Sequence, residues 1–95
     1  MAELSFEWDE EKNVANIKNH GVDFLDAALI FENPTLEVID QRADYAEVRY
    51  IAFGLSGVSV LQVVYTWRGE NIIRIISAWK ANRYDTEKYY REIFA

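Results

Sequence analysis

The sequence of 95 residues lacks cysteine, holds one histidine and one proline, and has no apolar run near the ~20 residues of a membrane-spanning helix. The lack of cysteine excludes a disulfide scaffold and a thiolate zinc site, and one histidine leaves few ways to build another transition-metal site. The first residues do not join a basic region to an apolar run, as a signal peptide does. We therefore expect a soluble cytoplasmic protein that needs no cofactor.

Basic residues are also scarce. Ten Lys and Arg stand against sixteen Asp and Glu, so the formal net charge is −6. Such a charge repels polyanions at long range, which argues against a general nucleic-acid binder. It is compatible with an enzyme that has a local basic cleft, and acidic surface elsewhere suits a basic protein partner.

Apolar residues, in contrast, are plentiful. Hydrophobic residues make up 51% of the chain and aromatic residues 15%, a content typical of ordered globular domains rather than disordered tails. At this length the chain can form one hydrophobic core but not two. We expect a single domain over residues 1–95.

The N-terminal third predicts one strand and two short helices. Alternating apolar residues at positions 4, 6 and 8 indicate the strand. Asp9 is suited to cap a helix that ends near residue 20, with Val14 and Ile17 as its apolar stripe. Gly21 stands where a left-handed C-cap is wanted. Asp23 caps the second helix, which stops at the Asn-Pro pair of residues 33–34.

From residue 35 the apolar period changes to two, which predicts strands. The expected strands span residues 36–40, 48–55, 58–67 and 72–80. Their short connections predict an antiparallel meander. Asn82 opens a last helix, whose packing side carries Thr86, Tyr89, Tyr90, Ile93 and Phe94. The order β-α-α-β-β-β-β-α predicts an α+β domain with its helices mainly on one face of the sheet.

The stretch of residues 71–80 is an apolar strand interrupted by one arginine, Arg74. A guanidinium in such a strand either pairs with a carboxylate, such as Glu37 or Glu47, or stands on an open face where an anion can meet it. Strict alternation places Ile73, Ile75, Ser77 and Trp79 on one face. The other face then carries Arg74 together with Lys80.

Several separated motifs in this chain resemble the BrnT family. They are Phe6-Glu7-Trp8-Asp9, Lys12, Asn16, Lys18-x-His20-Gly21-Val22, Phe24, Ala27, Phe31, Arg49, Gly54 and residues 73–78 (Ile-Arg-Ile-Ile-Ser-Ala). The family consists of bacterial ribonuclease toxins of type II toxin–antitoxin pairs with a compact RelE-like fold. The resemblance implies an RNA substrate and a cognate DNA-binding antitoxin of the BrnA type. It implies either a homodimer or a toxin–antitoxin heterotetramer as the assembly.

Metal-independent RNA cleavage needs a proton removed from a 2′-hydroxyl, charge stabilised on a phosphorane and a proton given to the leaving oxygen. Arg49 and Arg74, which match arginines of the family, suit the second task because a guanidinium binds two phosphate oxygens. For Arg49, as for Arg74, pairing with an acid such as Glu47 or Glu37 is the alternative. His20 is the candidate for proton transfer, although a histidine at a helix C-terminus often only caps carbonyl groups. The candidates for RNA binding are Lys18, Arg68, Lys80 and Arg83, each of which has a plain surface role as the alternative.

One departure from the family pattern is Trp79, which stands where the family most often has an arginine. The indole either fills space under the last helix or stacks on a base. Two functions of other classes therefore stay open beside the ribonuclease. One is a catalytically weakened protein-binding module, and the other is a small acid–base or sugar-phosphate enzyme, for which no nucleotide loop or metal motif is present.

Overall fold

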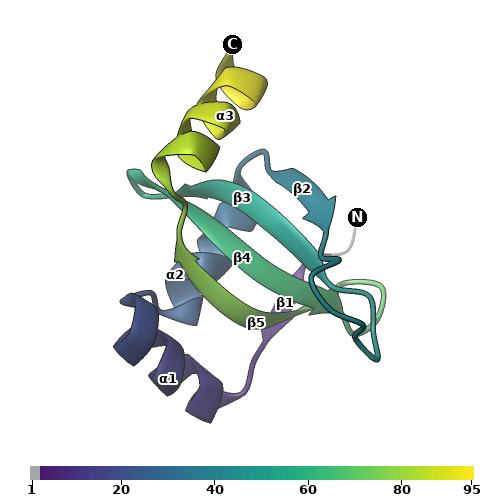
Figure 1. Ribbon diagram of the computed structural model, residues 1–95. Helices are drawn as coiled ribbons and strands as arrows, with labels where there is room; N and C mark the ends of the chain where they lie inside the picture. Colours follow the sequence, from purple (N-terminus) through teal and green to yellow (C-terminus); the bar gives the residue numbers. More distant parts are fainter. Residues whose placement is uncertain (1–2) are drawn as a thin grey trace.

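The structure is a computed structural model that describes residues 3–95, which form a five-stranded sheet with three α-helices (Figure 1). The elements are β1 (Ser5–Glu7), α1 (Glu10–His20), α2 (Phe24–Ala28), a short 3-10 helix η1 (Leu29–Glu32), β2 (Leu36–Ile39), β3 (Tyr50–Ser56), β4 (Ser59–Trp67), β5 (Ile72–Lys80) and α3 (Arg83–Phe94). The predicted α+β class is confirmed. No helix within residues 3–95 is long and apolar enough to cross a membrane.

The strands lie in the order β1-β5-β4-β3-β2. Strands β2 to β5 form the antiparallel meander that the short connections predicted. β1 differs, because it pairs in parallel with β5, with Ser5 opposite Ile72 and Glu7 opposite Arg74. A parallel neighbour is possible here because β1 and β5 are far apart in sequence and no tight turn has to join them.

The predicted helix caps are confirmed. The Asp9 side chain accepts a hydrogen bond from the N–H of Lys12 (3.1 Å), and Asp23 accepts one from the N–H of Leu25 (3.0 Å). Gly21 ends α1 in the left-handed conformation, with a φ of 70°. These local signals fix where the helices begin and end.

One face of the sheet is covered by α2 and η1, and we call it the covered face. Its core contains Phe24 and Ile30 from these helices, and Ile73 and Ile75 from β5. The helix layer lies so close that a Cβ on Gly54 would be 2.8 Å from the Cβ of Ile30. Burial of this apolar surface is the main stabilising contribution that the fold receives.

Helix α1 packs against the edge of β5 beyond the end of β1, and its buried residues are asparagines. The Asn16 side chain donates to the Ala78 carbonyl (2.8 Å) and accepts from the Ala78 N–H (3.1 Å), as a neighbouring strand would. The prediction that Val14 and Ile17 form the buried apolar stripe of this helix is wrong, because their exposed fractions are 66% and 41%. A strand edge presents free N–H and C=O groups, so the helix that covers it needs amides rather than aliphatic side chains.

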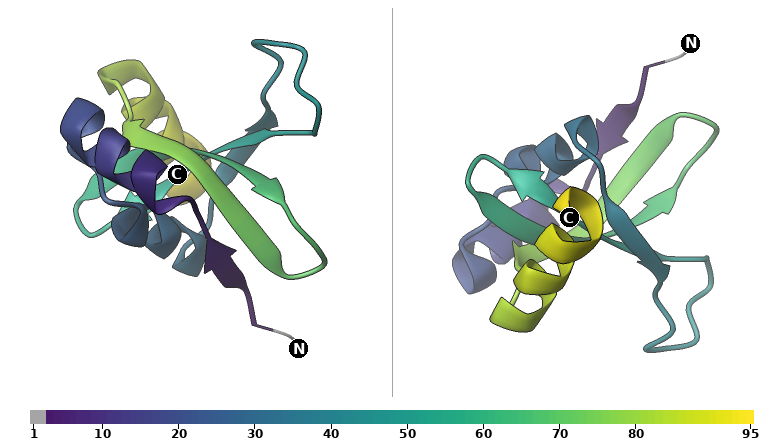
Figure 2. Two further views of the ribbon diagram at one scale, coloured as in Figure 1. Left: turned by 90° about the horizontal axis from the view of Figure 1, so that it is seen from below. Right: turned by 90° about the horizontal axis from the view of Figure 1, so that it is seen from above.

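Helix α3 lies on the side of the sheet opposite α2, as the two views of Figure 2 show. The prediction that the helices lie mainly on one face therefore does not hold for α3. The helix contacts β2 and β3 and buries Tyr89, whose hydroxyl donates to the Pro34 carbonyl (2.7 Å). Tyr90 and Phe94, expected on the packing side, are exposed.

Candidate functional site

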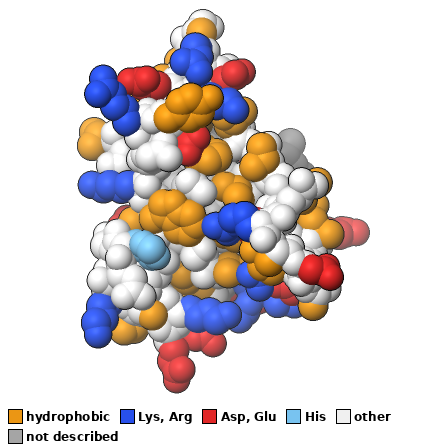
Figure 3. All heavy atoms as spheres, in the orientation of Figure 1, with side chains coloured by type: hydrophobic (Ala, Val, Ile, Leu, Met, Phe, Trp, Pro, Cys, Tyr) orange, Lys and Arg blue, Asp and Glu red, His pale blue; other side chains and the backbone are white. Residues whose placement is uncertain are grey.

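The candidate site is the face of the sheet that α2 does not cover, which we call the open face. Figure 3 looks onto it and shows a hydrophobic side chain beside the pale-blue imidazole of the only histidine, with Lys and Arg side chains farther out on the same face. Helix α3 and the segment 40–49, between β2 and β3, both lie on this side of the sheet (Figure 2). The open face is therefore flanked at its two ends.

A β-bulge in β5 decides which side chains reach the open face. Tyr65 pairs with Ile75 and Val64 pairs with Ser77, so Ile76 is an extra residue between the two pairs. Arg74 lies opposite Thr66 on the open face, but after the bulge the alternation is reversed and Trp79 joins it there. The prediction that Lys80 shares the face of Arg74 is therefore wrong. A one-residue insertion exchanges the two faces for every later residue of the strand.

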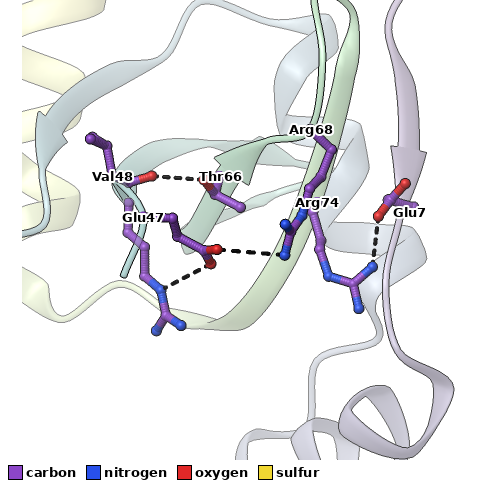
Figure 4. A network of polar contacts seen from close by, with 7 residues as sticks. Glu7, Glu47, Val48, Thr66, Arg68 and Arg74 are labelled. Carbon is purple, nitrogen blue, oxygen red and sulfur yellow. Dashed lines mark hydrogen bonds and ion pairs between the residues drawn. The ribbon is translucent and has the colours of Figure 1, made fainter. Parts of the chain in front are cut away.

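Arg74 stands on the open face, with an exposed side-chain fraction of 30%. Its Nη1 donates to Glu7 Oε2 at 2.6 Å, and Figure 4 shows this contact across the parallel β1–β5 pair. Glu7 is the only carboxylate paired with Arg74 within residues 3–95, so the expected partners Glu37 and Glu47 do not contact it. The Nε and Nη2 groups of Arg74 have no acceptor in the described part of the chain and can meet another ligand.

Arg49 is the last residue of the segment 40–49 and lies just before β3. Its guanidinium carbon lies 4.1 Å from the centre of the Tyr45 ring, and its Nε lies 3.7 Å from Glu47 Oε1. That Nε is buried and has no hydrogen-bond partner among the described residues. Glu47 also contacts Arg68 Nη2 at 3.5 Å, so one carboxylate lies between two guanidinium groups (Figure 4). The predicted alternative of pairing with Glu47 is confirmed for Arg49.

His20 is the last residue of α1, and its ring centre lies 5.6 Å from that of Trp79. The Ile17 carbonyl, in the last turn of α1, is capped instead by the backbone N–H of Gly21 (2.8 Å). The imidazole is therefore held at the rim of the open face by an aromatic contact. Lys18 is an exposed residue of the same last turn.

The remaining predicted cations are spread over the molecule. Lys80 lines a hollow of about 340 Å³ on the side of α2, together with Asp26 and Leu61. Arg83 is exposed and pairs with Glu87 one helical turn later, at 3.1 Å. Glu47 brings Arg49 and Arg68 together, and Thr66, which lies opposite Arg74, donates to the Val48 carbonyl next to Arg49 (2.7 Å). Lys80 lies apart from these three arginines.

Sequence reasoning missed Arg42, which lies between the two strands expected at residues 36–40 and 48–55. Its Nε and Nη2 each donate to the Asp40 carboxylate at 2.8 Å, and its guanidinium carbon lies 5.8 Å from the centre of the Trp79 ring. Arg42 donating to the buried Asp40 carboxylate lowers the pKa of that carboxyl to about 2. Only the Asp-x-Arg spacing of residues 40–42 gave any signal for this pair, and such spacing is common in loops.

No group of three or more His, Cys, Asp or Glu side chains is arranged to hold a metal ion in the part of the chain that the structure describes. The charge on the open face comes instead from guanidinium groups, each held by a carboxylate on one side. Arginines in this arrangement suit the binding of phosphate groups.

The fold and the open face define a class: a small α+β domain with an arginine-bearing sheet face suited to an anionic ligand. The family model described as "Ribonuclease toxin, BrnT, of type II toxin-antitoxin system" matches residues 8–85, and the chain belongs to this family. Membership implies an RNA substrate and an antitoxin partner.

A solved structure supports this assignment. The chain is similar to the Brucella abortus ribonuclease toxin BrnT in its crystal structure, with a TM-score of 0.62 and 25% sequence identity. The match covers 84% of this chain and 99% of the Brucella chain. A comparison with curated protein sequences gives no significant match.

Proposed function

We propose that this chain is a ribonuclease toxin that cuts RNA without a metal and is neutralised by a DNA-binding antitoxin of the BrnA type. The observation that carries the proposal is Arg74, a guanidinium inside an apolar strand that reaches the open face and, among residues 3–95, meets one carboxylate. Burying part of a charge in such a strand is costly, so a function on that face is the best reason for it.

The reaction we propose is a transesterification, in which the 2′-oxygen attacks the neighbouring phosphodiester. The 2′-hydroxyl loses its proton and attacks phosphorus, the bond to the 5′-oxygen breaks, and that oxygen takes up a proton. The products are a 2′,3′-cyclic phosphate and a 5′-hydroxyl. Two guanidinium groups can balance the negative charge of the pentacoordinate phosphorane.

Arg74 and Arg49 are the proposed groups that contact the reacting phosphate. The Nε and Nη2 groups of Arg74 have no protein acceptor within residues 3–95, and the Arg49 side chain keeps an exposed fraction of 27% beside Glu47. His20, at the rim of the same face, is the proposed proton-transfer group. Lys18, Arg68 and Arg83 extend the RNA contact around it, whereas Lys80 lies on the covered face and has no part in it.

The deciding experiment compares Arg74→Ala with Arg91→Ala, which removes an exposed positive charge from the last turn of α3. Induced expression of the parent in bacteria should arrest growth and degrade RNA. Purified Arg74→Ala should cleave RNA about 100-fold more slowly or worse, in the presence of EDTA, because a group that stabilises the transition-state charge is lost. Arg91→Ala should behave as the parent. An Arg74→Ala chain as active as the parent removes Arg74 from the site.

The antitoxin part of the proposal is tested separately. A small reading frame next to the gene should encode a DNA-binding protein whose co-expression restores growth. Light scattering on the purified complex then distinguishes a heterotetramer from a simple pair. Absence of such a neighbouring gene would contradict the antitoxin part of the proposal.

The ion pairs favour a second candidate, a BrnT-like protein-binding module with weakened catalysis. Arg74 with Glu7 and Arg49 with Glu47 are each partly neutralised, and Trp79 takes a place on the open face. Such a protein would bind the antitoxin but leave RNA intact. The EDTA cleavage assay with the parent chain separates the two candidates.

A further inference from the structure

Arg42 lies in the segment 40–49, which projects on the open-face side of the sheet beyond the ends of β2 and β3 (Figure 2). The segment is closed at its base by a hydrogen bond from the Asp40 N–H to the Arg49 carbonyl (2.8 Å). Arg42 and Arg49 are therefore carried by one connected piece of backbone. Each guanidinium also faces an aromatic ring, Trp79 for Arg42 and Tyr45 for Arg49.

The Arg42 side chain is fixed in place although it is 54% exposed. Its Nε and Nη2 donate to the two carboxylate oxygens of Asp40, and the backbone N–H of Arg42 donates to the same carboxylate (3.1 Å). The indole of Trp79 contributes a cation–π contact. A long side chain that is already ordered loses less conformational entropy when it binds a ligand.

The Asp40 carboxylate uses the Nε and Nη2 groups of Arg42 and leaves Nη1 for another acceptor, and the Tyr45 hydroxyl lies near the same pair. The Arg42 guanidinium lies over the ring of Trp79, on the face that carries Arg74, and Trp79 also contacts the only histidine. Trp79 is on that face solely because of the bulge at Ile76. The bulge and the ordered segment 40–49 together bring a further guanidinium to the open face.

We infer that Arg42 is a second phosphate-binding residue, which holds a phosphodiester of single-stranded RNA next to the one that is cut. Asp40 and Trp79 act as its positioning residues. The inference rests on the proposed function, since it adds a subsite to the same face. It also gives Trp79 a role that neither core filling nor base stacking describes.

The test measures binding of a fluorescein-labelled 2′-O-methyl RNA of about 12 nucleotides, which has no free 2′-hydroxyl and is therefore not cut. Fluorescence anisotropy is recorded over a range of salt concentrations for Arg42→Gln and for the matched control Arg91→Gln. Both variants lose one positive charge. Arg42→Gln should bind about fivefold more weakly, with a salt slope smaller by about 0.7, the value for one lost phosphate contact on a single strand. Arg91→Gln should keep the parent slope.

Trp79→Leu keeps the Asp40–Arg42 pair and serves as a second variant should Arg42→Gln unfold. If Trp79 only positions Arg42, Trp79→Leu weakens binding and the double variant binds no more weakly than Arg42→Gln. Losses that add in the double variant would overturn this role for Trp79 and indicate direct stacking on a base. Thermal unfolding of every variant checks that the fold is kept.

Arg74→Ala on the same probe separates the inference from the proposed function. If Arg74→Ala weakens binding while Arg42→Gln behaves as Arg91→Gln, the Arg42 subsite is overturned and the proposed function stands. A parent chain that does not bind the RNA overturns both.

Discussion

The two faces of the sheet are built from the same strands but have different roles. On the covered face, Ile73 and Ile75 are buried against α2 and η1. On the open face, their neighbour Arg74 keeps a partly exposed guanidinium beside Glu7. Adjacent residues of one strand thus belong to the core and to the candidate site. A single strand can therefore supply residues to both the core and the site, provided that its register is fixed.

The register of β5 is fixed by different partners along its length. Its first residues pair with β1, whereas Ala78 pairs with the Asn16 side chain of α1. Between these two anchors lies the bulge at Ile76, which reverses the alternation. The position of Trp79 on the open face therefore depends on a helix at the edge of the sheet.

The largest expected effect comes from Asn16→Leu, which removes the anchor of β5 after the bulge. The substitution leaves three buried backbone groups unpaired: the Ala78 N–H, the Ala78 carbonyl and the Val22 carbonyl. We expect the free energy of unfolding to fall by about 4 kcal/mol. Urea denaturation measures it, and Asn19→Leu, an exposed position on the same helix, is the control. Equal losses in both variants would refute the edge-pairing role of Asn16.

The next largest effect is expected from a comparison of two substitutions, Ile75→Ala and Arg74→Ala, which change neighbouring residues on opposite faces of the sheet. Ile75 is buried in the core, so its truncation should cost about 3 kcal/mol of unfolding free energy. Arg74→Ala loses a partly exposed ion pair, so it should cost less than about 1 kcal/mol. The RNA cleavage rate should show the opposite ranking. A comparable loss of stability in both variants would mean that Arg74 is itself part of the stabilising core rather than of a functional site.

The smallest expected effect is the pH dependence of the free energy of unfolding that comes from the Asp40–Arg42 pair in the segment 40–49. The hydrogen bonds from Arg42 lower the pKa of Asp40 from about 4, its ordinary value, to about 2. Because the folded pKa is lower than the unfolded one, this stabilisation is complete above about pH 4 and is lost as the pH falls toward 2. We expect a loss of about 1–2 kcal/mol in that window, since the exposed Arg42 is screened by water.

Asp40→Asn should remove that part of the acid dependence, whereas Asp44→Asn, at an exposed position of the same segment, should retain it. Urea unfolding at pH 7 and at about pH 2.5 measures the difference for each variant. An acid dependence that Asp40→Asn leaves unchanged would show that the Asp40–Arg42 pair contributes nothing to stability.

Local features of the fold could be predicted from the sequence because their causes lie within a few residues. Asp9, Asp23 and Asn82 cap helices through contacts two or three positions away. The four strands of the meander follow from apolar alternation and short turns. The parallel pairing of β1 had no such local signal, because it joins residues about 67 positions apart, as Arg74 with Glu7.

The candidate site was predicted less completely than the fold. Arg49, Arg74 and His20 do reach or border one face, and all three belong to the motifs that resemble the BrnT family. Lys80 was assigned to the wrong face because a bulge leaves no mark in the apolar pattern of residues 72–80. Arg42 was missed because its partner Trp79 is far along the chain.

By itself the sequence determined the α+β class, the helix caps, the meander and the family, since these depend on nearby residues and on motifs in order. Only the tertiary structure decided which side chains share the open face. That choice depends on the bulge in β5 and on the edge contact of Asn16, and both arise from pairing between segments distant in the chain. Alternation along one strand defines two faces, but the contacts of its neighbours determine where each face begins and ends.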